Sequence, residues 1–390
     1  MKGEIKMEKI VYADNSATTK IHPDVISEML PYLQENFGNP SSMYKLGRTS
    51  KKAIANARTQ LAELLSCSAN EIYFTSCGSE SINWALKGAA KIIKAKGKKH
   101  IITSMFEHHA VLHTMDSLKD QGFEITYLKP DENGIISPEN LENAITQNTG
   151  LVSIMYVNNE IGSIQPIKEL CKIAKRSDIL FHTDAVQATA QIPIDVKDLN
   201  VDFLSLSGHK FGAPKGIGAL YCKKGIKLKS YIDGGAQENG KRAGTENTAF
   251  IVGLGKAAEI ANNIMQEKHD KVKKLRDKLL SSLLEIPDSR LNGNLENRIY
   301  GNINIGFKGI EGEALVLMLD VKYGICVSTG SACTSGFTTA SHVLTSIDVP
   351  EEYAKSSIRI TLGMDNTEEE IEYIANALKE TISLLRSLSI

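Results

Sequence analysis

The middle of the chain alternates short apolar runs, rich in β-branched residues, with longer amphipathic segments. The short runs are EIYFTS (71–76), HIITSM (100–105), LVSIMYV (151–157), ILFHTDA (179–185), VDFLSLS (201–207) and GIGALYC (216–222). Strands that alternate with helical segments form βαβ units, which place the strands in a mostly parallel sheet covered by helices. This pattern therefore predicts an α/β protein.

The pattern changes after about residue 260. QEKHDKVKKLRDKLLSSLLEI (266–286) predicts a long amphipathic helix, and INIGFKGI (303–310) and SSIRITLG (356–363) predict strands. A helix with Thr367 as its N-cap and glutamates in its first turn would close the chain. We predict a large α/β domain over 16–260 and a smaller α+β domain made of 1–15 and 261–390.

The charge and composition of the chain limit the kinds of molecule that it is expected to bind. The 390 residues carry a net charge of -1, with a pI near 6.8, which gives no general attraction to nucleic acid or anionic membrane. The N-terminus lacks the apolar stretch of a signal peptide, and no apolar run is long enough to span a bilayer. We expect a cytoplasmic protein. The six cysteines follow neither a disulfide framework nor zinc-ligand spacing.

The segment VDFLSLSGHKFGAPKGIGALYC (201–222) indicates a lysine at the end of a strand. The strand runs to Ser207, and a Ser-Gly-His-Lys turn then presents Lys210. Ligands of open α/β sheets gather at the carboxyl ends of the strands. A lysine there can form a Schiff base with an aldehyde cofactor such as pyridoxal phosphate (PLP). Taken alone, the segment fits a surface lysine equally well.

Two other strand ends carry groups that such a cofactor needs. Asp184 ends the strand ILFHTDA, one strand before Lys210, and Gln187 follows. A carboxylate there would keep the pyridinium nitrogen of PLP protonated, although a helix N-cap explains Asp184 as well. Gly78 and Ser79 begin a helix after the strand of YFTSCGSESIN, where backbone N–H groups would bind a phosphate. Many helices begin with Gly-Ser, so this signal alone is weak.

Three further residues carry reactive or charged groups. His108, in MFEHHAVL, could move protons, although a structural role explains a histidine beside His109 better when it is seen alone. Cys333 lies among small polar residues in GICVSTGSACTSGFTT, which predicts an exposed loop and a nucleophilic thiol, whereas Cys326 fits a buried one. Arg359, in SSIRITLG, fits a substrate carboxylate or an ordinary surface arginine.

Taken together, these segments resemble the cysteine desulfurases of the NifS/IscS type, which belong to the fold-type I, class V aminotransferase-like PLP enzymes. The resemblance covers nearly the whole chain. The matching motifs, in order, are YADNSATT (12–19), FGNPSS (37–42), FTSCGSESIN, EHHAVL, VSIMYVNNEIG (152–162), HTDAVQ (182–187), LSGHKFGAPKGIGALY, GGAQENGKRAGTEN (234–247), STGSACTSG and SSIRITLG. The loop STGSACTS resembles the iron–sulfur-assembly branch of the family. So many motifs in the family's order predict a mostly parallel, seven-stranded type of sheet.

The resemblance implies a role for each site residue. The catalytic residues would be Lys210, which holds PLP, His108, which manages protons, and Cys333, which receives the sulfur. The cofactor-binding residues would be Gly78, Ser79, His108, Asn158, Asp184, Gln187, Ser207, Gly208, His209, Lys210 and Thr245. Thr245 would reach the phosphate of the partner subunit, which implies a homodimer. Asn158 and Arg359 would bind the carboxylate of L-cysteine.

The implied reaction removes sulfur from L-cysteine, giving L-alanine and a persulfide on Cys333. The sulfur would go to an iron–sulfur scaffold or another acceptor protein, including carriers for thio-cofactors or tRNA thiolation. In some members the matching cysteine helps to hold a nascent [2Fe-2S] cluster, which would make Cys333 a transient metal ligand. The alternatives are a selenocysteine lyase, another PLP aminotransferase-like enzyme and a non-catalytic assembly scaffold.

Two positions depart from the family pattern. Ile82 stands where the family commonly has Asp, and HKFGAP differs from the commoner HKIYGP or HKFHGP. We expect neither position to take part in the chemistry.

Overall fold

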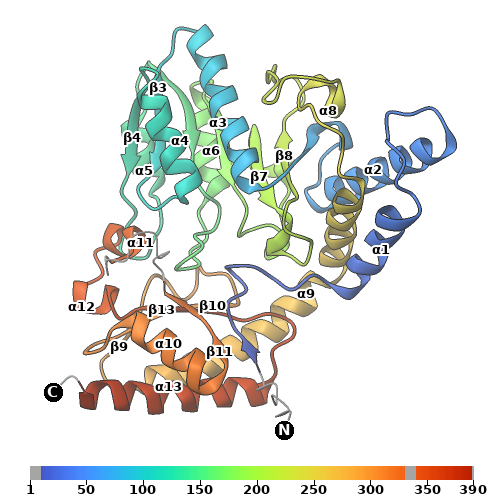
Figure 1. Cartoon of the computed structure of the whole chain (residues 1–390). Helices are drawn as coiled ribbons and strands as arrows, with labels where there is room; N and C mark the ends of the chain where they lie inside the picture. Colours follow the sequence, from blue (N-terminus) through green and yellow to red (C-terminus); the bar gives the residue numbers. More distant parts are fainter. Residues whose placement is uncertain (1–9, 330–339, 389–390) are drawn as a thin grey trace.

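A computed structural model describes residues 10–329 and 340–388. Its largest element is a seven-stranded sheet, drawn in the upper part of Figure 1. In spatial order the strands are β2 (Ile72–Thr75), β8 (Gly218–Cys222), β7 (Phe203–Ser207), β6 (Leu180–Asp184), β5 (Thr149–Ser153), β3 (His100–Ser104) and β4 (Glu124–Leu128). The pairs from β7 through β6, β5 and β3 to β4 are parallel, and β8 is antiparallel to both of its neighbours. The predicted α/β class with a mostly parallel sheet is confirmed.

Helices cover both faces of this sheet because successive strand residues point to opposite sides. Ile101 packs with α3 and α4, whereas its neighbour Ile102 packs in the core on the other face. Leu151 and Val152 divide in the same way. The helices of this part are α1 (Pro23–Gln34), α2 (Lys45–Leu64), α3 (Gly78–Ala95), α4 (His109–Lys119), α5 (Pro138–Ala144), α6 (Ile167–Arg176), α7 (Val196–Leu199) and α8 (Gln237–Gly240). Burial on both faces explains why the residues of β2, β3, β5, β7 and β8 are all buried, whereas those of the edge strand β4 are mostly half-exposed.

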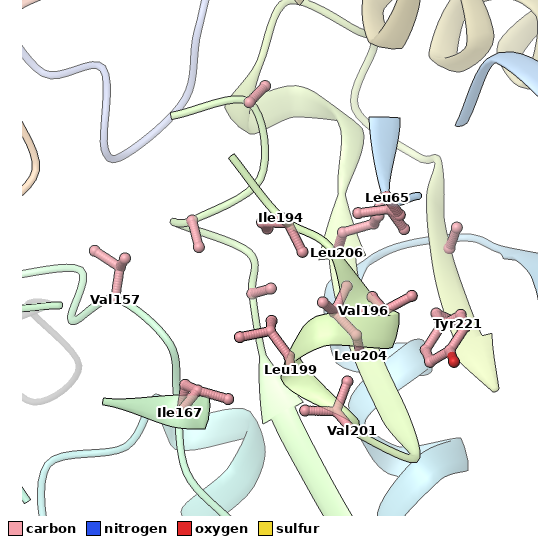
Figure 2. Packing of buried hydrophobic residues seen from close by; sticks show 14 of the residues in the cluster. Leu65, Val157, Ile167, Ile194, Val196, Leu199, Val201, Leu204, Leu206 and Tyr221 are labelled. Carbon is pink, nitrogen blue, oxygen red and sulfur yellow. The ribbon is translucent and has the colours of Figure 1, made fainter. Parts of the chain in front are cut away.

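Figure 2 shows part of the larger core. Leu204 and Leu206 of β7 lie near Leu65, Val196 and Tyr221, which come from three other segments of the chain. All of these side chains are buried. The carboxyl end of β7, which leads to Lys210, is therefore fixed by packing from several directions.

A second, smaller set of strands and helices forms the lower part of Figure 1. Its four-stranded sheet runs β12 (Ser328–Thr329), β13 (Ile358–Thr361), β10 (Asn302–Phe307), β9 (Ser289–Leu291), and β1 (Val11–Tyr12) pairs with β11 (Ile325–Cys326). The helices of the C-terminal stretch are α9 (Thr248–Leu284), α10 (Gly312–Tyr323), α11 (His342–Ser346), α12 (Glu351–Ala354) and α13 (Glu368–Leu388). Of these, α11 and α12 pack their buried residues in the larger core. The side chain of Thr367 accepts a hydrogen bond from the Glu370 N–H at 3.3 Å, as its predicted capping role requires.

The helix α9 links the two parts. Its first half packs in the core of the large sheet through Ile251 and Leu254, and its second half packs in the small core through Val272 and Leu279. The predicted boundary at 260/261 falls inside this continuous helix. The division into 16–260 and 1–15 with 261–390 stays a prediction. Among the described residues, no helix is long and apolar enough to cross a membrane.

Candidate active site

A cavity of about 340 Å³ opens where β6 and β7 end and where α3 and α4 begin. Residues from the small part of the molecule close one side of it. Its lining residues are Ser16, Ala17, Cys77, Gly78, Ser79, Ile82, His108, Met155, Val157, Asn159, Asp184, Val186, Gln187, Ser207, His209, Lys210 and Arg359. The cavity therefore brings together most of the residues that the sequence singled out, although they come from distant segments.

Lys210 lies at the end of a short 3-10 turn, Gly208–Lys210, that directly follows β7. Its Nζ donates to the carbonyl oxygens of Ser16, at 2.5 Å, and Ala17, at 2.9 Å. Burial and the nearby Arg359 lower the pKa of the Lys210 ammonium to about 8. A lysine with a lowered pKa is neutral more often near neutral pH, as a nucleophilic amine must be.

Asp184 ends β6, which is the direct parallel neighbour of β7. Its side chain is 4% exposed, and its Oδ1 accepts a hydrogen bond from the Val186 N–H at 2.9 Å. Burial raises the pKa of this carboxyl group to about 6, although Lys210 opposes the shift. A buried carboxylate with one backbone partner can still accept a hydrogen bond from a protonated ring nitrogen. Gln187 lies beside it and donates to Ser16 O at 2.9 Å.

His108 is the N-cap of α4, and its Nδ1 accepts a hydrogen bond from the Ala110 N–H at 3.1 Å. His108 therefore has a structural role as a helix cap, and its ring also lines the cavity. The enclosing protein desolvates the imidazole, and Lys210 repels its positive charge, so the pKa of His108 falls to about 4. A neutral imidazole can accept a proton or relay one.

The start of α3 forms one end of the cavity. Gly78 is the first helical residue, and Ser79 beside it is exposed to the cavity. A Cβ added to Gly78 would lie 2.8 Å from Val186 Cγ2 and 3.3 Å from Ser207 Cβ, so only glycine fits this close approach. The first N–H groups of a helix lack partners within that helix and attract anions. This end of the cavity suits a phosphate group.

Arg359 reaches the cavity from β13 of the small sheet. It is 7% exposed. Its guanidinium donates to the Asn159 carbonyl oxygen at 3.0 Å and to Asp14 Oδ1 at 2.9 Å, and its buried Nε has no hydrogen-bond partner among the described residues. This held cation lines the same cavity as Lys210 and Asp184, where it can bind the carboxylate of an amino acid.

Four predicted site residues are not among the described residues that line the cavity. Asn158 is fully buried, and its side chain bonds the backbone of Phe106, Glu160 and Ile161. Gly208 supports the lysine turn without lining the cavity. Thr245 lines a separate hollow of about 250 Å³. Cys333 lies outside the described residues. The roles predicted for these four residues stay predictions.

The cavity also contains residues that the sequence analysis did not assign to it. Asn159 is on the wall where Asn158 was expected, and the two adjacent asparagines gave no means to choose between them. Cys77 is the N-cap of α3 and lines the same end of the cavity. Ile82, which we expected to lie outside the chemistry, is part of the wall as well. An apolar side chain at this position limits the shape of the cavity and adds no charge to it.

The described cysteines are poor nucleophiles where they are buried. Burial raises the pKa of Cys67, Cys171 and Cys222 to about 12, which keeps them as thiols. Cys326 is half-buried, and its pKa is also raised, mainly by burial. Within residues 10–329 and 340–388 no group of His, Cys, Asp and Glu residues could hold a metal ion.

The arrangement fits PLP on three counts. The cavity presents an amine that can bond covalently to an aldehyde, a buried carboxylate on the neighbouring strand, and a helix start where a glycine leaves room beside Val186. Lys210, Asp184 and the Gly78–Ser79 turn would hold these three parts of the cofactor.

Comparisons with known proteins agree with this geometry. The family model for aminotransferase class-V matches residues 11–374, and the chain belongs to that family. A protein of Methanosarcina thermophila named cysteine desulfurase IscS is 54% identical over 98% of this chain and 94% of its own length. The predicted resemblance to the NifS/IscS type is thereby confirmed.

Solved structures extend the comparison. The structure of a NifS-like protein is 40% identical to this chain, with a TM-score of 0.91. The match covers 97% of this chain and 100% of the NifS-like chain. A structure described as SspA in complex with cysteine is 38% identical, with a TM-score of 0.80. The match covers 90% of this chain and 99% of the SspA chain. The predicted fold-type I PLP-dependent transferase is confirmed.

Proposed function

We propose that this protein is a cysteine desulfurase that uses PLP to transfer sulfur from L-cysteine to Cys333. The observation that carries the proposal is the single cavity shared by Lys210, Asp184, His108 and Arg359. It offers an amine, a ring-nitrogen partner, a proton carrier and a carboxylate-binding cation. The relatives named cysteine desulfurase and the relative described in complex with cysteine support this substrate.

Each residue then has a defined task. PLP, when bound, supplies the electron sink that weakens bonds at the substrate carbons. Arg359 holds the substrate carboxylate, and Lys210, once released, removes the proton from the α-carbon. Asp184 keeps the ring nitrogen protonated, and its burial makes that charge pair stronger than it would be in water. His108, neutral near neutral pH, takes the proton from the attacking thiol.

The sulfur transfer balances without another reactant. The Cβ–S bond of L-cysteine breaks, and the Cys333 thiolate forms an S–S bond with the departing sulfur. The electron pair left at Cβ takes up a proton. L-cysteine and one Cys333 thiol therefore give L-alanine and one Cys333 persulfide. The raised pKa values of the buried cysteines support Cys333 as the acceptor over Cys67, Cys171 and Cys222.

A homodimer is part of the proposal. Large apolar side chains are exposed along α1 and the segment before α2: Ile26, Leu30, Leu33, Phe37, Met43 and Tyr44. Figure 1 places α1, α2 and α8 together at one edge of the molecule. An apolar face of this kind suits contact with a second copy. Thr245, which lies outside this chain's own cavity, would then be available to the partner's site.

The acceptor of the sulfur belongs to the same proposal. The persulfide would pass to an iron–sulfur scaffold protein in the cytoplasm, with carriers for thio-cofactors or tRNA thiolation as other acceptors. Cys333 would serve as a transient ligand of a [2Fe-2S] cluster during that transfer. The relatives named cysteine desulfurase do not favour a selenocysteine lyase or another aminotransferase. A non-catalytic scaffold is not favoured, because lysine, aspartate and arginine are together in one cavity.

Incubation of the purified, PLP-loaded protein with L-cysteine tests the proposal. We expect alanine and sulfur to appear in equal amounts, and an adduct of about 32 Da on Cys333 before reductant is added, as a persulfide requires. Protein with bound PLP that forms neither alanine nor an adduct would exclude desulfuration by the protein alone. Keto acid formation from cysteine would indicate an aminotransferase instead.

A further inference from the structure

An ion pair lies directly beside the start of α3, the end of the cavity that suits a phosphate group. Arg242 donates from Nε to Glu80 Oε1 at 2.9 Å and from Nη2 to Glu80 Oε2 at 3.2 Å. Both side chains are largely shielded from water. Two parallel hydrogen bonds of this kind hold the guanidinium and the carboxylate in one relative orientation.

Glu80 belongs to the first turn of α3 and follows Ser79, which lines the cavity. Its Oε2 also accepts hydrogen bonds from the N–H of Ser76, at 2.8 Å, and from the hydroxyl group of Ser76, at 2.5 Å. Although burial opposes the shift, these bonds and those from Arg242 lower the pKa of the Glu80 carboxyl group. Glu80 is therefore ionised, and its negative charge belongs to the same helical turn as Gly78 and Ser79.

A carboxylate at this position competes with a phosphate. The start of a helix carries a partial positive charge, which favours a glutamate in the first turn and also attracts an anion from the cavity. An unpaired Glu80 would use part of this positive potential and would repel the phosphate charge in a space that contains little water. The guanidinium of Arg242 cancels the charge of Glu80, so the start of α3 keeps its attraction for a phosphate.

Arg242 comes from a distant part of the chain. It is 162 positions from Glu80, in the segment that follows α8. A bridge to Ile232 fixes the backbone of Arg242, and the N–H of Ala243 donates to the Ile232 carbonyl oxygen at 3.0 Å. Neither Arg242 nor Glu80 is among the residues that line the cavity. The pair can therefore act on the site through its charge and not through contact with a ligand.

We propose that Arg242 is a positioning residue for the cofactor, because it neutralises Glu80 and thereby keeps the start of α3 able to bind the phosphate group of PLP. Glu80 can then cap the Ser76 N–H without repelling the cofactor. The inference rests on the PLP site of the proposed function and adds a residue to it. It does not depend on which reaction the bound cofactor carries out.

Comparison of PLP with pyridoxal, which lacks the phosphate, isolates the effect of the phosphate charge. The dissociation constants of both are measured from the change in cofactor absorbance, after bound cofactor has been removed from the full-length protein. We expect Arg242→Gln to lose about tenfold or more of the wild-type preference for PLP over pyridoxal, because Glu80 is then an unpaired negative charge. A merely structural role of Arg242 would weaken both ligands equally.

Two further variants change the charge in the opposite direction. The double variant Arg242→Gln with Glu80→Gln removes both charges, and its preference for PLP should return to within about threefold of wild type. Glu80→Gln alone leaves the guanidinium unpaired and should raise the preference about threefold or more above wild type. The glutamine can still accept both hydrogen bonds from Ser76.

Arg58→Gln is the matched control. Arg58 also donates two hydrogen bonds to one buried glutamate, Glu238, at 2.7 and 2.6 Å. Glu238 accepts a further bond from the Phe74 N–H of β2 and has no hydrogen bond to the start of α3. The preference of Arg58→Gln for PLP over pyridoxal should therefore match that of wild type.

An unchanged preference in Arg242→Gln, or a preference in the double variant as low as in Arg242→Gln, would overturn the inference. Should Arg242→Gln not fold, Glu80→Gln decides, because a preference equal to or below that of wild type refutes the inference and a higher one supports it. Wild-type protein that binds PLP no better than pyridoxal would refute it as well. Alanine release is measured separately. If the preferences follow the expected order and no alanine appears, the inference holds and the proposed desulfuration fails.

Discussion

The two sides of the cavity are built differently. On the side of the large sheet, Asp184, Lys210 and His108 follow strand ends, and desolvation is the largest cause of their pKa shifts, to about 6, 8 and 4. On the side of the small sheet, Arg359 is held by direct partners, Asp14 and the Asn159 carbonyl. Burial prepares one side for proton transfer and covalent bonding, whereas pairing prepares the other side to recognise charge.

Among the substitutions on the large-sheet side of the cavity, loss of Lys210 should reduce activity the most. We expect Lys210→Ala to lose the absorbance band of covalently held cofactor and at least about 10³-fold in kcat, since no other described residue on the cavity wall carries an amine that could take the α-proton. Absorbance spectra and alanine release measure the two effects. Retention of the band would contradict the assignment of Lys210.

Substitution of the sulfur acceptor should leave the large-sheet side intact. We expect Cys333→Ser to bind PLP and L-cysteine normally while persulfide formation falls to background, because serine cannot form the S–S bond. The matched control is Cys77→Ser, which changes a cysteine of the cavity wall. Intact-mass analysis should find the adduct in the control and not in Cys333→Ser. The reverse result would transfer the acceptor role to Cys77.

A charge-conserving change tests the small-sheet side. We expect Arg359→Lys to raise KM for L-cysteine by about 10- to 100-fold, with a smaller effect on kcat, because an ammonium cannot replace the planar fork that Asp14, Asn159 and the substrate share. Steady-state kinetics with sulfide detection separate the two constants. An unchanged KM would place the substrate carboxylate elsewhere.

The smallest effect concerns stability on the large-sheet side. Burial raises the pKa of Glu107 to about 8, so the folded protein keeps this carboxyl protonated where the unfolded chain has lost the proton. The group therefore favours folding less as pH rises from about 4.5 to about 8. Glu107→Gln removes this titration, and its Tm relative to wild type should rise by about 1–3 °C between about pH 5 and about pH 8.

Thermal unfolding at several pH values measures this difference. Glu107 Oε1 accepts hydrogen bonds from Ser104 and from the Met155 N–H, and Oε2 has no partner in the part of the chain that the structure describes. A glutamine can therefore keep both bonds. A relative Tm that stays constant or falls with pH would show that Glu107 is ionised in the folded protein.

Much of the large-sheet side could be predicted because strand ends are visible in the sequence. The apolar run before Lys210 and the run before Asp184 both end at the residues that line the cavity. The edge strand β4 was not predicted, since its residues Glu124–Leu128 are mostly half-exposed and lack a continuous apolar run. The long helix α9 was predicted only in its second half, because its first half is buried and lacks an amphipathic pattern.

The sequence could not show which of two neighbouring residues lines the cavity. Asn158 and Asn159 have the same chemistry, and only the turn decides that the second lines the cavity while the first bonds the backbone. Ile82 and Cys77 show the same limit, because a helix start can direct either residue to the wall. The ion pair between Asp14 and Arg359 joins residues 345 positions apart.

Local patterns and motifs were enough to predict the alternation of strands and helices, the lysine turn, the aspartate one strand away and the family. The tertiary structure decided which groups share the cavity, which asparagine faces it and how far burial moves the pKa values of Lys210 and Asp184. These properties depend on the atoms that exclude water from each group, and those atoms come from segments far apart in the chain.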